Sequence, residues 1–436
     1  MTRRLCRQIL YGNTLSGFSG VITLSVAAGD FDISHKNEDF SFEHILVFLF
    51  LSLYNINDFF KTNSVKTERK CTYLEISIDK IDKRLAVSSS VNVDGLCFYD
   101  VREEPFDVYG FYGYRSEPTF KRLPDEIARN TNSGVAGLYT NTAGGRVRFA
   151  TDSERVVIVA EMPGVCHMPH MPLCSSAGFD LYVDCPENKT SRFYNVFKPH
   201  IGMDDGYTSE INFPIRKLRY LTVNFPSYSN VSALYIGICE GARLEHGLKY
   251  RNVLPIVYYG SSITQGACSS RPGNAFANII SRRTDTDFIN LGFSGSAKGE
   301  EVIARYMSTL PMSVFVSDYD HNSTVEELKQ QHYKLYEIIR ERNPLIPYIM
   351  ISRPDFNKQT YVENLCRRDI VFESYRTAKA KKDENVYFID GSGMFRTVNE
   401  DMCTVDGTHP NDYGFFLMAD AIESELRWIW ASADIV

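Results

Sequence analysis

The residue types that point to chemistry in this chain are a serine, a carboxylate and a histidine. Gly260, Ser261 and Ser262 follow a short apolar run, at a predicted junction between a strand and a helix. A serine at such a junction is presented at the edge of a sheet, where the helix N-terminus favours negative charge. Serine is also a common helix cap. The position alone therefore leaves a nucleophile and a capping residue as alternatives.

Near the end of the chain, an aspartate precedes a histidine by three residues. Asp406 and His409 lie in the sequence Asp-Gly-Thr-His-Pro, just before a predicted helix. A carboxylate at this spacing can accept a hydrogen bond from the imidazole and fix its tautomer, as a histidine base requires. The alternative is an exposed Asp-Gly turn beside an unrelated histidine. The pair predicts a base for a serine nucleophile.

Two further loops carry polar groups that suit an oxyanion or a metal. Gly295 lies in a glycine-rich loop, where the backbone can approach a ligand and offer an N–H group. A second loop holds Asp318, Asp320, His321 and Asn322. The Asn322 amide can donate to an oxyanion, whereas the other three side chains are possible metal ligands. The matching loops contain no obvious set of cysteines or histidines, so we expect no metal.

The elements around these loops alternate between strand and helix. The predicted strands are 255–259, 287–291, 313–316, 348–352 and 386–389, and the predicted helices are 274–283, 300–310, 323–342, 361–382 and from about 411 onward. Ser323 and Glu326 predict a capping box at the start of one helix. Successive strand–helix units predict a parallel sheet covered by helices on both faces. Ligands bind at the carboxyl ends of such strands, where the polar loops would meet.

The middle of the chain predicts an antiparallel sandwich or jelly roll. Short runs rich in β-branched and aromatic residues are separated by turn residues, at 87–93, 145–150, 155–161, 178–183, 220–225 and 232–238. One loop in this region contains His167 and His170 among prolines and methionines. A metal pair would need a third ligand and a helix, which the prolines oppose. The other interpretations are a packed proline-rich loop and a loop that shapes a substrate pocket.

The four blocks together resemble those of the SGNH, or GDSL-type, hydrolases. Their order is Gly-x-Ser, Asn-x-Gly-x-x-Gly, Asn and Asp-x-x-His. The resemblance implies a flavodoxin-like α/β/α sandwich with a five-stranded parallel sheet. It also implies that Ser262 is the nucleophile, that His409 is the base and that Asp406 orients it. The oxyanion hole would then consist of the Ser262 and Gly295 N–H groups and the Asn322 amide.

The strings YYGSSITQGACSSRPGNAF and INLGFSGSAKGE are similar to a subgroup with an N-terminal β-sandwich domain. Members of that subgroup resemble carbohydrate esterases, which remove acyl groups, usually acetyl, from sugars. Two positions depart from the family pattern: Ser261 replaces the Asp of Gly-Asp-Ser, and a gapless count places His321 where the third-block Asn belongs. We therefore keep His321 as the alternative oxyanion donor. We further expect His170, Met171, Arg271 and His321 to contact the substrate.

These patterns divide the chain into three parts. We expect an extension of unknown role at 1–71, a jelly-roll-like accessory domain at 72–250 and a catalytic domain at 251–436. The apolar run 45–53 is shorter than the roughly 20 residues that a membrane span needs. The net charge of −7 gives no reason to expect a nucleic-acid partner. The ten scattered cysteines include no Cys-x-x-Cys, which favours free thiols and a cytoplasmic location.

The predicted function is that of a serine esterase without metal or cofactor, which hydrolyses short acyl esters, acetyl in particular, carried by a small molecule or an oligosaccharide. Three alternatives remain: a lipase- or thioesterase-type acyl hydrolase, an acyltransferase, and a carbohydrate-binding protein that has lost catalysis.

Overall fold

The structure, a computed structural model, describes residues 87, 90–354, 361–396 and 400–432. The predicted extension at 1–71 and the apolar run at 45–53 lie outside the described residues. Within the described part of the chain, no helix combines the length and the apolar character that crossing a bilayer requires. Eight cysteines fall in this part, and all eight are free thiols.

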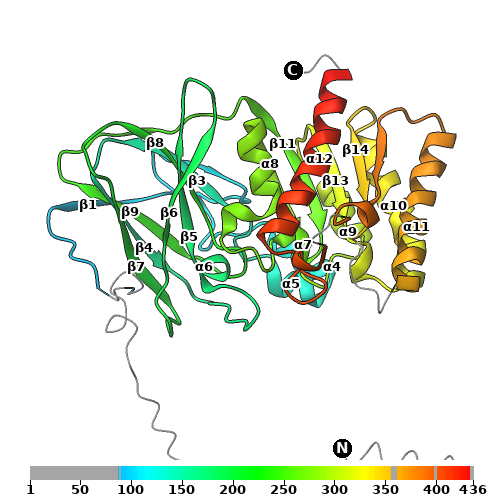
Figure 1. Cartoon of the computed structure of the whole chain (residues 1–436), viewed down its shortest axis with the longest axis horizontal. Coiled ribbons are helices and arrows are strands. Elements are labelled where there is room, and N and C mark those ends of the chain that lie inside the picture. Colours follow the sequence, from blue (N-terminus) through cyan, green and yellow to red (C-terminus); the bar gives the residue numbers. More distant parts are fainter. Residues whose placement is uncertain (1–86, 88–89, 355–360, 397–399, 433–436) are drawn as a thin grey trace, which may run out of the picture. The chain divides into compact units, whose positions relative to one another are not determined.

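The C-terminal part is built on a five-stranded parallel sheet, as predicted (Figure 1). Its strands are β11 (Asn252–Gly260), β12 (Thr286–Gly292), β13 (Val314–Asp318), β14 (Tyr348–Ile351) and β15 (Val386–Ile389). Their spatial order is β12-β11-β13-β14-β15, so the first strand of the sheet lies between the second and third. This is the flavodoxin-like order, and its switch point lies at the carboxyl end of β11.

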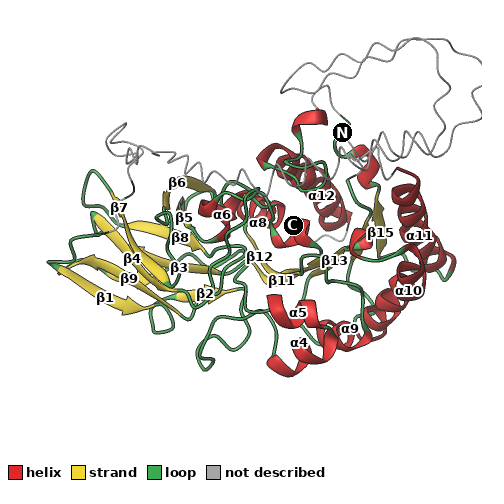
Figure 2. Cartoon of the chain, turned by 90° about the horizontal axis from the view of Figure 1, so that it is seen from below, coloured by secondary structure: helices red, strands yellow, loops and turns green. Residues whose placement is uncertain are grey.

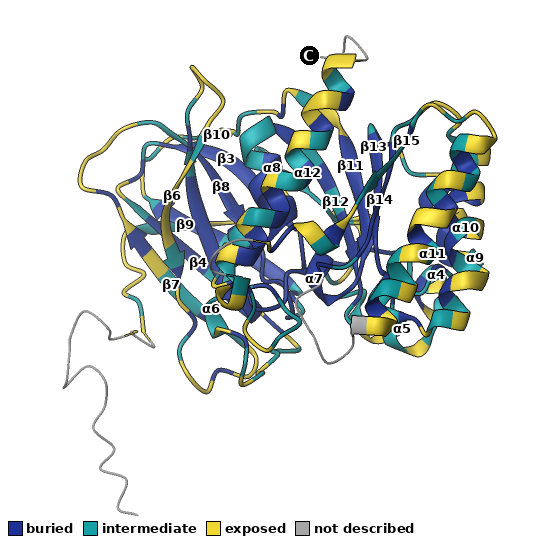
Figure 3. Cartoon of the chain, turned by 45° about the vertical axis from the view of Figure 1, so that its right-hand side comes forward, coloured by how far each residue is buried: buried dark blue, intermediate teal, exposed yellow. Residues whose placement is uncertain are grey.

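Helices cover both faces of this sheet because its strands are apolar on both sides. Ile256 and Tyr258 of β11 pack with α8 (Phe276–Thr284) and α12 (Asp412–Ser432). Val257 and Tyr259, which alternate with them, pack with α9 (Glu301–Ser308), α10 (Val325–Arg342) and α11 (Tyr361–Ala380). Figure 3 shows the buried strands between helices whose outer faces are exposed. This alternation, with a period of two residues, produces the three-layer sandwich.

The capping box of α10 lies one residue later than predicted. Thr324, not Ser323, is the N-cap, and its hydroxyl accepts a hydrogen bond from the Glu327 N–H at 3.2 Å. The Glu327 carboxylate in turn accepts from the Thr324 N–H at 2.8 Å. Both Ser323-x-x-Glu326 and Thr324-x-x-Glu327 fit the pattern, and the Ser323 side chain is instead buried.

The N-terminal part of the described chain consists of two antiparallel sheets that share one core (Figure 2). One sheet contains β1 (Leu96–Asp100), β9 (Ala233–Cys239), β4 (Arg155–Glu161) and β7 (Gly206–Asn212). The other contains β10 (Leu244–His246), β3 (Arg146–Thr151), β8 (Arg219–Asn224), β5 (Phe179–Asp184), β6 (Ser191–Phe197) and, paired with β3, β2 (Asp107–Tyr109). The jelly-roll assignment of this β-rich region stays a prediction.

Five of the six predicted runs in the β-rich region form strands within about two residues of the expected bounds, a shift that is ordinary for strand ends. The run 87–93 is wrong: its described positions are not in a strand, and the first strand begins at Leu96. A local hydrogen bond from the Asp94 N–H to the Asn92 side chain, at 2.9 Å, forms a turn just before it. Sequence analysis missed β6 and β7, whose polar residues hide the strand pattern.

The β-rich region and the parallel sheet belong to one compact unit, Ser77–Val436. Three short helices lie in the β-rich part of the sequence. They are α4 (Asp125–Thr131), α5 (Ser133–Leu138) and α6 (Leu173–Ser176). Apolar side chains of α4 and α5 join the core beneath α9 and α10. The predicted domain boundary at residue 250 therefore remains a prediction rather than a visible separation.

Candidate active site

Ser262 is the first residue of α7 (Ser262–Gln265), a one-turn helix after β11. The turn before it needs glycine, because a Cβ atom on Gly260 would lie 2.1 Å from the Thr264 hydroxyl. Ser261 is the helix cap, and its hydroxyl accepts from the Ile263 N–H at 3.1 Å. The capping role thus falls to Ser261, and the Ser262 side chain is left to make other contacts.

Ser262, His409 and Asp406 form one continuous hydrogen-bonded chain. The Ser262 Oγ lies 2.9 Å from the His409 Nε2, and the His409 Nδ1 lies 2.7 Å from the Asp406 Oδ2. With Nδ1 held by the carboxylate, the Nε2 lone pair is directed at the serine hydroxyl. The structure therefore brings together the three side chains that the sequence selected from loops more than 140 residues apart.

The loop from Asp406 to His409 is held by the same aspartate that holds the imidazole. Its Oδ1 accepts from the N–H groups of Thr408, at 3.0 Å, and His409, at 2.8 Å. Gly407 adopts a left-handed backbone with φ +82° at the tip of this turn. Burial raises the pKa of Asp406, but the hydrogen bonds from the backbone and ring of His409 outweigh this effect, so the pKa lies below the usual aspartate value. Asp406 is therefore a carboxylate at neutral pH.

Three donors suit an oxyanion next to Ser262. Among the described residues, the N–H groups of Ser262 and Gly295 have no hydrogen-bond acceptor. Gly295 has φ +63° and open space on the side where a Cβ atom would project. The Asn322 amide donates to the Phe293 carbonyl oxygen at 3.2 Å, which fixes it against the loop that carries Gly295. A primary amide has a second N–H, which stays available to a ligand.

His321, the alternative oxyanion donor, is engaged elsewhere. Its Nδ1 lies 3.0 Å from the Asp320 Oδ1. Asp318 accepts from the Thr264 hydroxyl at 2.9 Å, and burial raises its pKa to about 6. The Asp318 Oδ1 and the His321 Nε2 are buried and have no hydrogen-bond partner among the described residues. These side chains lie close enough to share one ion, so the metal alternative for this cluster stays open.

Arg122 is a positioning residue that sequence analysis missed. Its buried guanidinium donates to the carbonyl oxygens of Gly292, at 2.5 Å, and Asn141, at 2.8 Å. It also lies over the Phe293 ring, 4.5 Å from its centroid. Burial lowers the pKa of Arg122 to about 9, which leaves it protonated at neutral pH. Because Gly292 and Phe293 begin the loop that carries Gly295, this arginine of the β-rich region holds the proposed oxyanion loop in place.

Two other polar residues tie the loops of the site together. The Asn290 amide donates to the Thr264 carbonyl at 2.7 Å and thereby joins β12 to α7. The Arg353 guanidinium donates to the Thr408 hydroxyl at 3.2 Å, and its backbone N–H donates to Asp320 at 3.1 Å. Asn290 is the asparagine of the second sequence block, whereas Arg353 belongs to none of the blocks. An isolated arginine after a strand gives no sequence signal for such a role.

His170 and Met171 come from the β-rich region and lie beside the triad. The His170 ring is 5.9 Å from the His409 ring, measured between centroids. Met171 is only 6% exposed and packs in a small cluster with Tyr228 and Cys268. His170 is thus close enough to the triad to contact a substrate, while the buried Met171 side chain packs within this small cluster. Substrate contact remains a prediction for both residues.

Arg271 contacts the β-rich region. Its guanidinium donates to Asp180 at 3.1 Å and to the Tyr182 hydroxyl, and it lies 3.8 Å from the Phe193 ring centroid. Asp180 also accepts from the Gly273 N–H at 2.9 Å. These contacts anchor the chain between α7 and α8, and the predicted contact of Arg271 with a substrate remains a prediction.

Cys268 lies close to the triad, with its sulfur atom within 4.8 Å of ring nitrogens of His170 and His409. Burial, with a smaller contribution from the charge of Asp406, raises the pKa of its thiol to about 12. At neutral pH this thiol is protonated, so it does not compete with Ser262 as a nucleophile.

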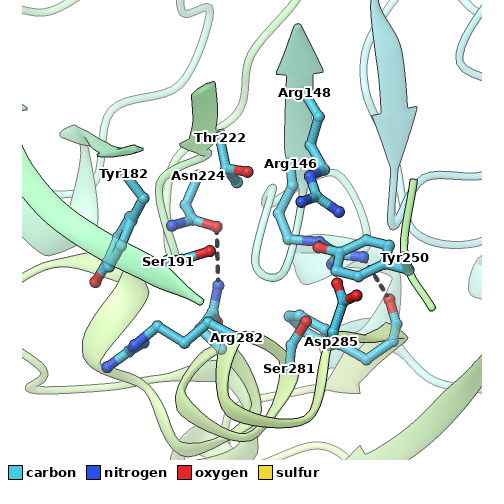
Figure 4. A pocket seen from close by; sticks show the side chains of 12 residues that line it. Arg146, Arg148, Tyr182, Ser191, Thr222, Asn224, Tyr250, Ser281, Arg282 and Asp285 are labelled. Atoms are coloured by element: carbon cyan, nitrogen blue, oxygen red, sulfur yellow. Dashed lines mark hydrogen bonds between the residues drawn. The ribbon is translucent and has the colours of Figure 1, made fainter. Parts of the chain in front are cut away.

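A polar cavity lies between the β-rich region and the parallel sheet, and its twelve lining residues include no member of the triad (Figure 4). Arg146, Arg148 and Tyr250 gather on one side of it. Arg146 is paired with Asp287, and Arg148 with Asp184 at 3.1 Å. We interpret this cavity as a polar junction between the two parts of the fold rather than as the reaction site.

Two protein-family models match the chain. The model of the GDSL-like lipase/acylhydrolase family matches residues 254–427, which contain Ser262 and His409. The model for the N-terminus of SGNH-hydrolase-type esterases matches residues 96–244. The two matches correspond to the parallel sheet and to the β-rich region. No curated protein matches the chain.

Solved structures share this arrangement over nearly their whole length. A GDSL-like lipase from Bacteroides ovatus is 26% identical, with a TM-score of 0.69 over 77% of this chain and 98% of that chain. The salicylyl-acyltransferase SsfX3 from a tetracycline biosynthetic pathway is 18% identical, with a TM-score of 0.64 over 78% and 98%. An active-site mutant of a family two carbohydrate esterase from Clostridium thermocellum is 15% identical, with a TM-score of 0.52 over 74% and 97%.

The last two similarities concern the fold alone, and the family models add the sequence evidence. The predicted fold class, a parallel α/β sheet preceded by a β-rich part, agrees with these matches. Residues 254–427 therefore match the GDSL-like lipase/acylhydrolase family and residues 96–244 match the N-terminal domain of SGNH-hydrolase-type esterases, and these matches support a serine esterase.

Proposed function

We propose that this protein hydrolyses short acyl esters, acetyl esters in particular, that are carried by carbohydrates, and that it does so through an acyl-enzyme on Ser262. The observation that carries the proposal is the unbroken chain from the Ser262 hydroxyl through the His409 imidazole to the Asp406 carboxylate. A serine hydroxyl is a weak nucleophile, and this geometry supplies the adjacent base that activates it.

In the first half of the reaction, Ser262 Oγ attacks the ester carbonyl while the His409 Nε2 accepts the hydroxyl proton. Asp406 stabilises the imidazolium that forms, because its carboxylate already accepts a hydrogen bond from Nδ1 at 2.7 Å. The carbonyl oxygen becomes an oxyanion beside the N–H groups of Ser262 and Gly295 and the Asn322 amide. The proton on Nε2 then passes to the leaving alcohol, and the acyl group stays on Ser262.

In the second half, water replaces the alcohol. His409 accepts a proton from water, the resulting hydroxide attacks the acyl carbonyl, and Ser262 recovers its proton as the acid leaves. Each oxyanion donor is expected to contribute about 3 kcal/mol to the transition state. All the proton transfers run through one imidazole nitrogen, so no metal or organic cofactor takes part in these steps.

A carbohydrate ester is supported by the two-part fold. Family two carbohydrate esterases share this architecture, although the likeness to them is in fold alone. In this chain, the β-rich region contributes His170 to the surroundings of the triad. His170, a side chain from outside the parallel sheet, could thus contact the carbohydrate that carries the acyl group.

The test compares hydrolysis of p-nitrophenyl acetate, butyrate and a long-chain ester, followed by acetylated xylan and peracetylated sugars. Wild type should prefer the short esters, and Ser262→Ala should lose turnover while keeping its unfolding transition. Ser270→Ala is the matched control, because Ser270 is a nearby serine bonded to Asp412 rather than to His409. Near-normal activity of Ser262→Ala would show that another residue is the nucleophile.

The alternatives give different outcomes in the same assay. Preference for the long-chain ester would indicate a lipase-type pocket. Transfer of the acyl group to an added sugar at the expense of hydrolysis would indicate an acyltransferase. Binding of oligosaccharide with no turnover of any ester would indicate a carbohydrate-binding protein.

A further inference from the structure

Three side chains of types that can bind a metal converge at the proposed active site. They are His170 from the β-rich region, Cys268 from the chain after α7, and His409 of the triad. Their ligand atoms all lie within 4.8 Å of one another. Cys268 is only 3% exposed, so its thiol is buried among the neighbouring side chains. The proposed reaction uses only one of the three side chains.

We propose that His170, Cys268 and His409 bind one zinc ion, and that this ion reversibly switches off the esterase. The inference rests on the proposed function, because inhibition follows from His409 being the base. Two imidazoles and a thiolate are the donor types that zinc prefers, and neither Mg²⁺ nor Ca²⁺ uses them. A fourth position would be filled by water or by the Ser262 hydroxyl.

The separation of the three ligand atoms suits a tetrahedral ion after a small adjustment. Zinc–nitrogen bonds of roughly 2.0–2.1 Å and a zinc–sulfur bond of about 2.3 Å place neighbouring ligand atoms roughly 3.3–3.6 Å apart. The present upper limit of 4.8 Å therefore requires a contraction of at most about 1.5 Å. Rotation of the His170 side chain, which lies on a loop and is only partly buried, provides movement of this size.

The triad geometry also prepares His409 for a metal. Asp406 accepts a hydrogen bond from Nδ1, so Nε2 carries the free lone pair. A carboxylate on the far nitrogen of a metal-binding histidine orients the ring and increases its basicity. The arrangement that makes His409 a base for Ser262 thus also makes it a zinc ligand.

Binding and catalysis exclude each other because they use the same lone pair. When Nε2 bonds to zinc, it cannot accept the Ser262 proton, and the 2.9 Å hydrogen bond between them is lost. Ser262 keeps its proton, the Cys268 thiol releases one proton to solvent, and the cation compensates the buried thiolate. No oxidation or reduction is involved.

The other candidate cluster is less suited to an ion. In Asp318, Asp320 and His321, one imidazole nitrogen and both Asp320 oxygens already take part in hydrogen bonds. The Arg353 cation, which lies near Asp318 and lowers its pKa, also opposes a bound cation. We therefore assign the zinc site to the cluster that contains His409.

The first arm of the test measures inhibition. The EDTA-treated protein is titrated with Zn²⁺ during p-nitrophenyl acetate hydrolysis, and activity should fall at least tenfold, return with EDTA, and be unaffected by Mg²⁺. Cys268→Ser and His170→Asn should each raise the zinc concentration for half-inhibition at least tenfold. Cys174→Ser is the control, since this free cysteine lies in α6 outside the cluster, and it should be inhibited as wild type is.

The second arm measures binding without activity. Co²⁺ added to Ser262→Ala should give the absorption of a tetrahedral site with a thiolate-to-metal band, and Ser262→Ala combined with Cys268→Ser should lack that band. Thermal unfolding of each variant confirms that it is folded. An active enzyme with no cobalt band, or with the same zinc inhibition in Cys268→Ser and His170→Asn, would overturn the zinc site. A cobalt band in a protein that hydrolyses no ester would uphold the metal site and reject the proposed function.

Discussion

Replacing Arg122 by methionine tests whether the β-rich region positions the proposed oxyanion loop. The guanidinium donates to four backbone carbonyl oxygens, those of Leu138 at 2.7 Å, Asn141 at 2.8 Å, Asn290 at 3.3 Å and Gly292 at 2.5 Å. Methionine fills a similar volume but donates no hydrogen bond. The substitution therefore frees the end of β12 just before Gly295.

Two opposing terms set the size of the effect. Hydrogen bonds from a charged donor contribute about 1.5–3 kcal/mol each. Burial lowers the pKa of Arg122 to about 9, which corresponds to a cost of about 5 kcal/mol for the buried cation relative to an ordinary arginine. The four hydrogen bonds together exceed this cost, and we expect Arg122→Met to lower the free energy of unfolding by roughly 1–7 kcal/mol. A lysine at this position would donate to fewer carbonyl oxygens and would still bury a charge. Arg122→Lys should therefore be no more stable than Arg122→Met.

The activity of the folded fraction distinguishes positioning from simple stability. Urea unfolding gives the stability of each variant, and kcat for p-nitrophenyl acetate is measured below the unfolding transition. If the oxyanion loop moves, kcat should fall up to about 100-fold, as for the loss of one donor, with a smaller change in KM. A folded Arg122→Met with wild-type kcat would refute the argument that this arginine holds the loop.

Arg102→Met serves as the matched control for this experiment. Arg102 also donates to two carbonyl oxygens, those of Tyr114 at 3.0 Å and Ser232 at 2.7 Å, and also lies over a phenylalanine ring. Its contacts stay within the β-rich region. Arg102→Met should therefore lower the free energy of unfolding but leave kcat unchanged.

Three other predictions follow from single contacts. Burial raises the pKa of Asp318 to about 6, so its protonated form stabilises the fold at low pH, and this contribution is lost as pH rises from about 4 through 6. Between pH 4 and pH 7, the free energy of unfolding from urea titrations should therefore fall less in Asp318→Asn than in wild type, and the difference should be up to about 3 kcal/mol. The same pH dependence in both proteins would contradict this account. Thr324→Ala should lower the free energy of unfolding by about 1 kcal/mol in the same assay, and Ser323→Ala by clearly less, because only Thr324 caps α10; a larger loss for Ser323→Ala would contradict this cap. Asp406→Asn should lower kcat roughly 10⁴-fold with the fold intact, because the amide favours the wrong His409 tautomer, and a loss of less than tenfold would show that Asp406 does not orient the imidazole.

The sequence was sufficient for the parallel sheet and for the meeting of the triad. Continuous apolar runs such as that of β11, alternating with helical spacing, allow few topologies. Once the sheet is parallel, the carboxyl ends of its strands lie at one edge, and the loops with Ser262 and His409 must approach each other. Local residue order therefore predicted a contact across 147 residues.

The contacts that sequence analysis missed are those in which a side chain binds backbone. Arg122 recognises carbonyl oxygens some 170 positions away, and any residue type offers a carbonyl, so no pattern marks the partner. The Asp320 carboxylate likewise accepts from the Arg353 backbone N–H, which nearly any residue type would offer. The strands β6 and β7 were missed for another reason: their exposed polar residues do not alternate with apolar ones clearly enough to indicate a half-buried strand.

The replacement of the family's aspartate by Ser261 is understandable from the turn itself. The Ser261 hydroxyl accepts the hydrogen bond from the Ile263 N–H that a carboxylate at a helix N-cap would accept, so the short helix α7 keeps its cap. A carboxylate there would place a negative charge one residue from Ser262, where the proposed oxyanion develops, and like charges repel. The neutral hydroxyl keeps the geometry without that repulsion. The departure from the Gly-Asp-Ser pattern is thus compatible with the esterase chemistry proposed for Ser262.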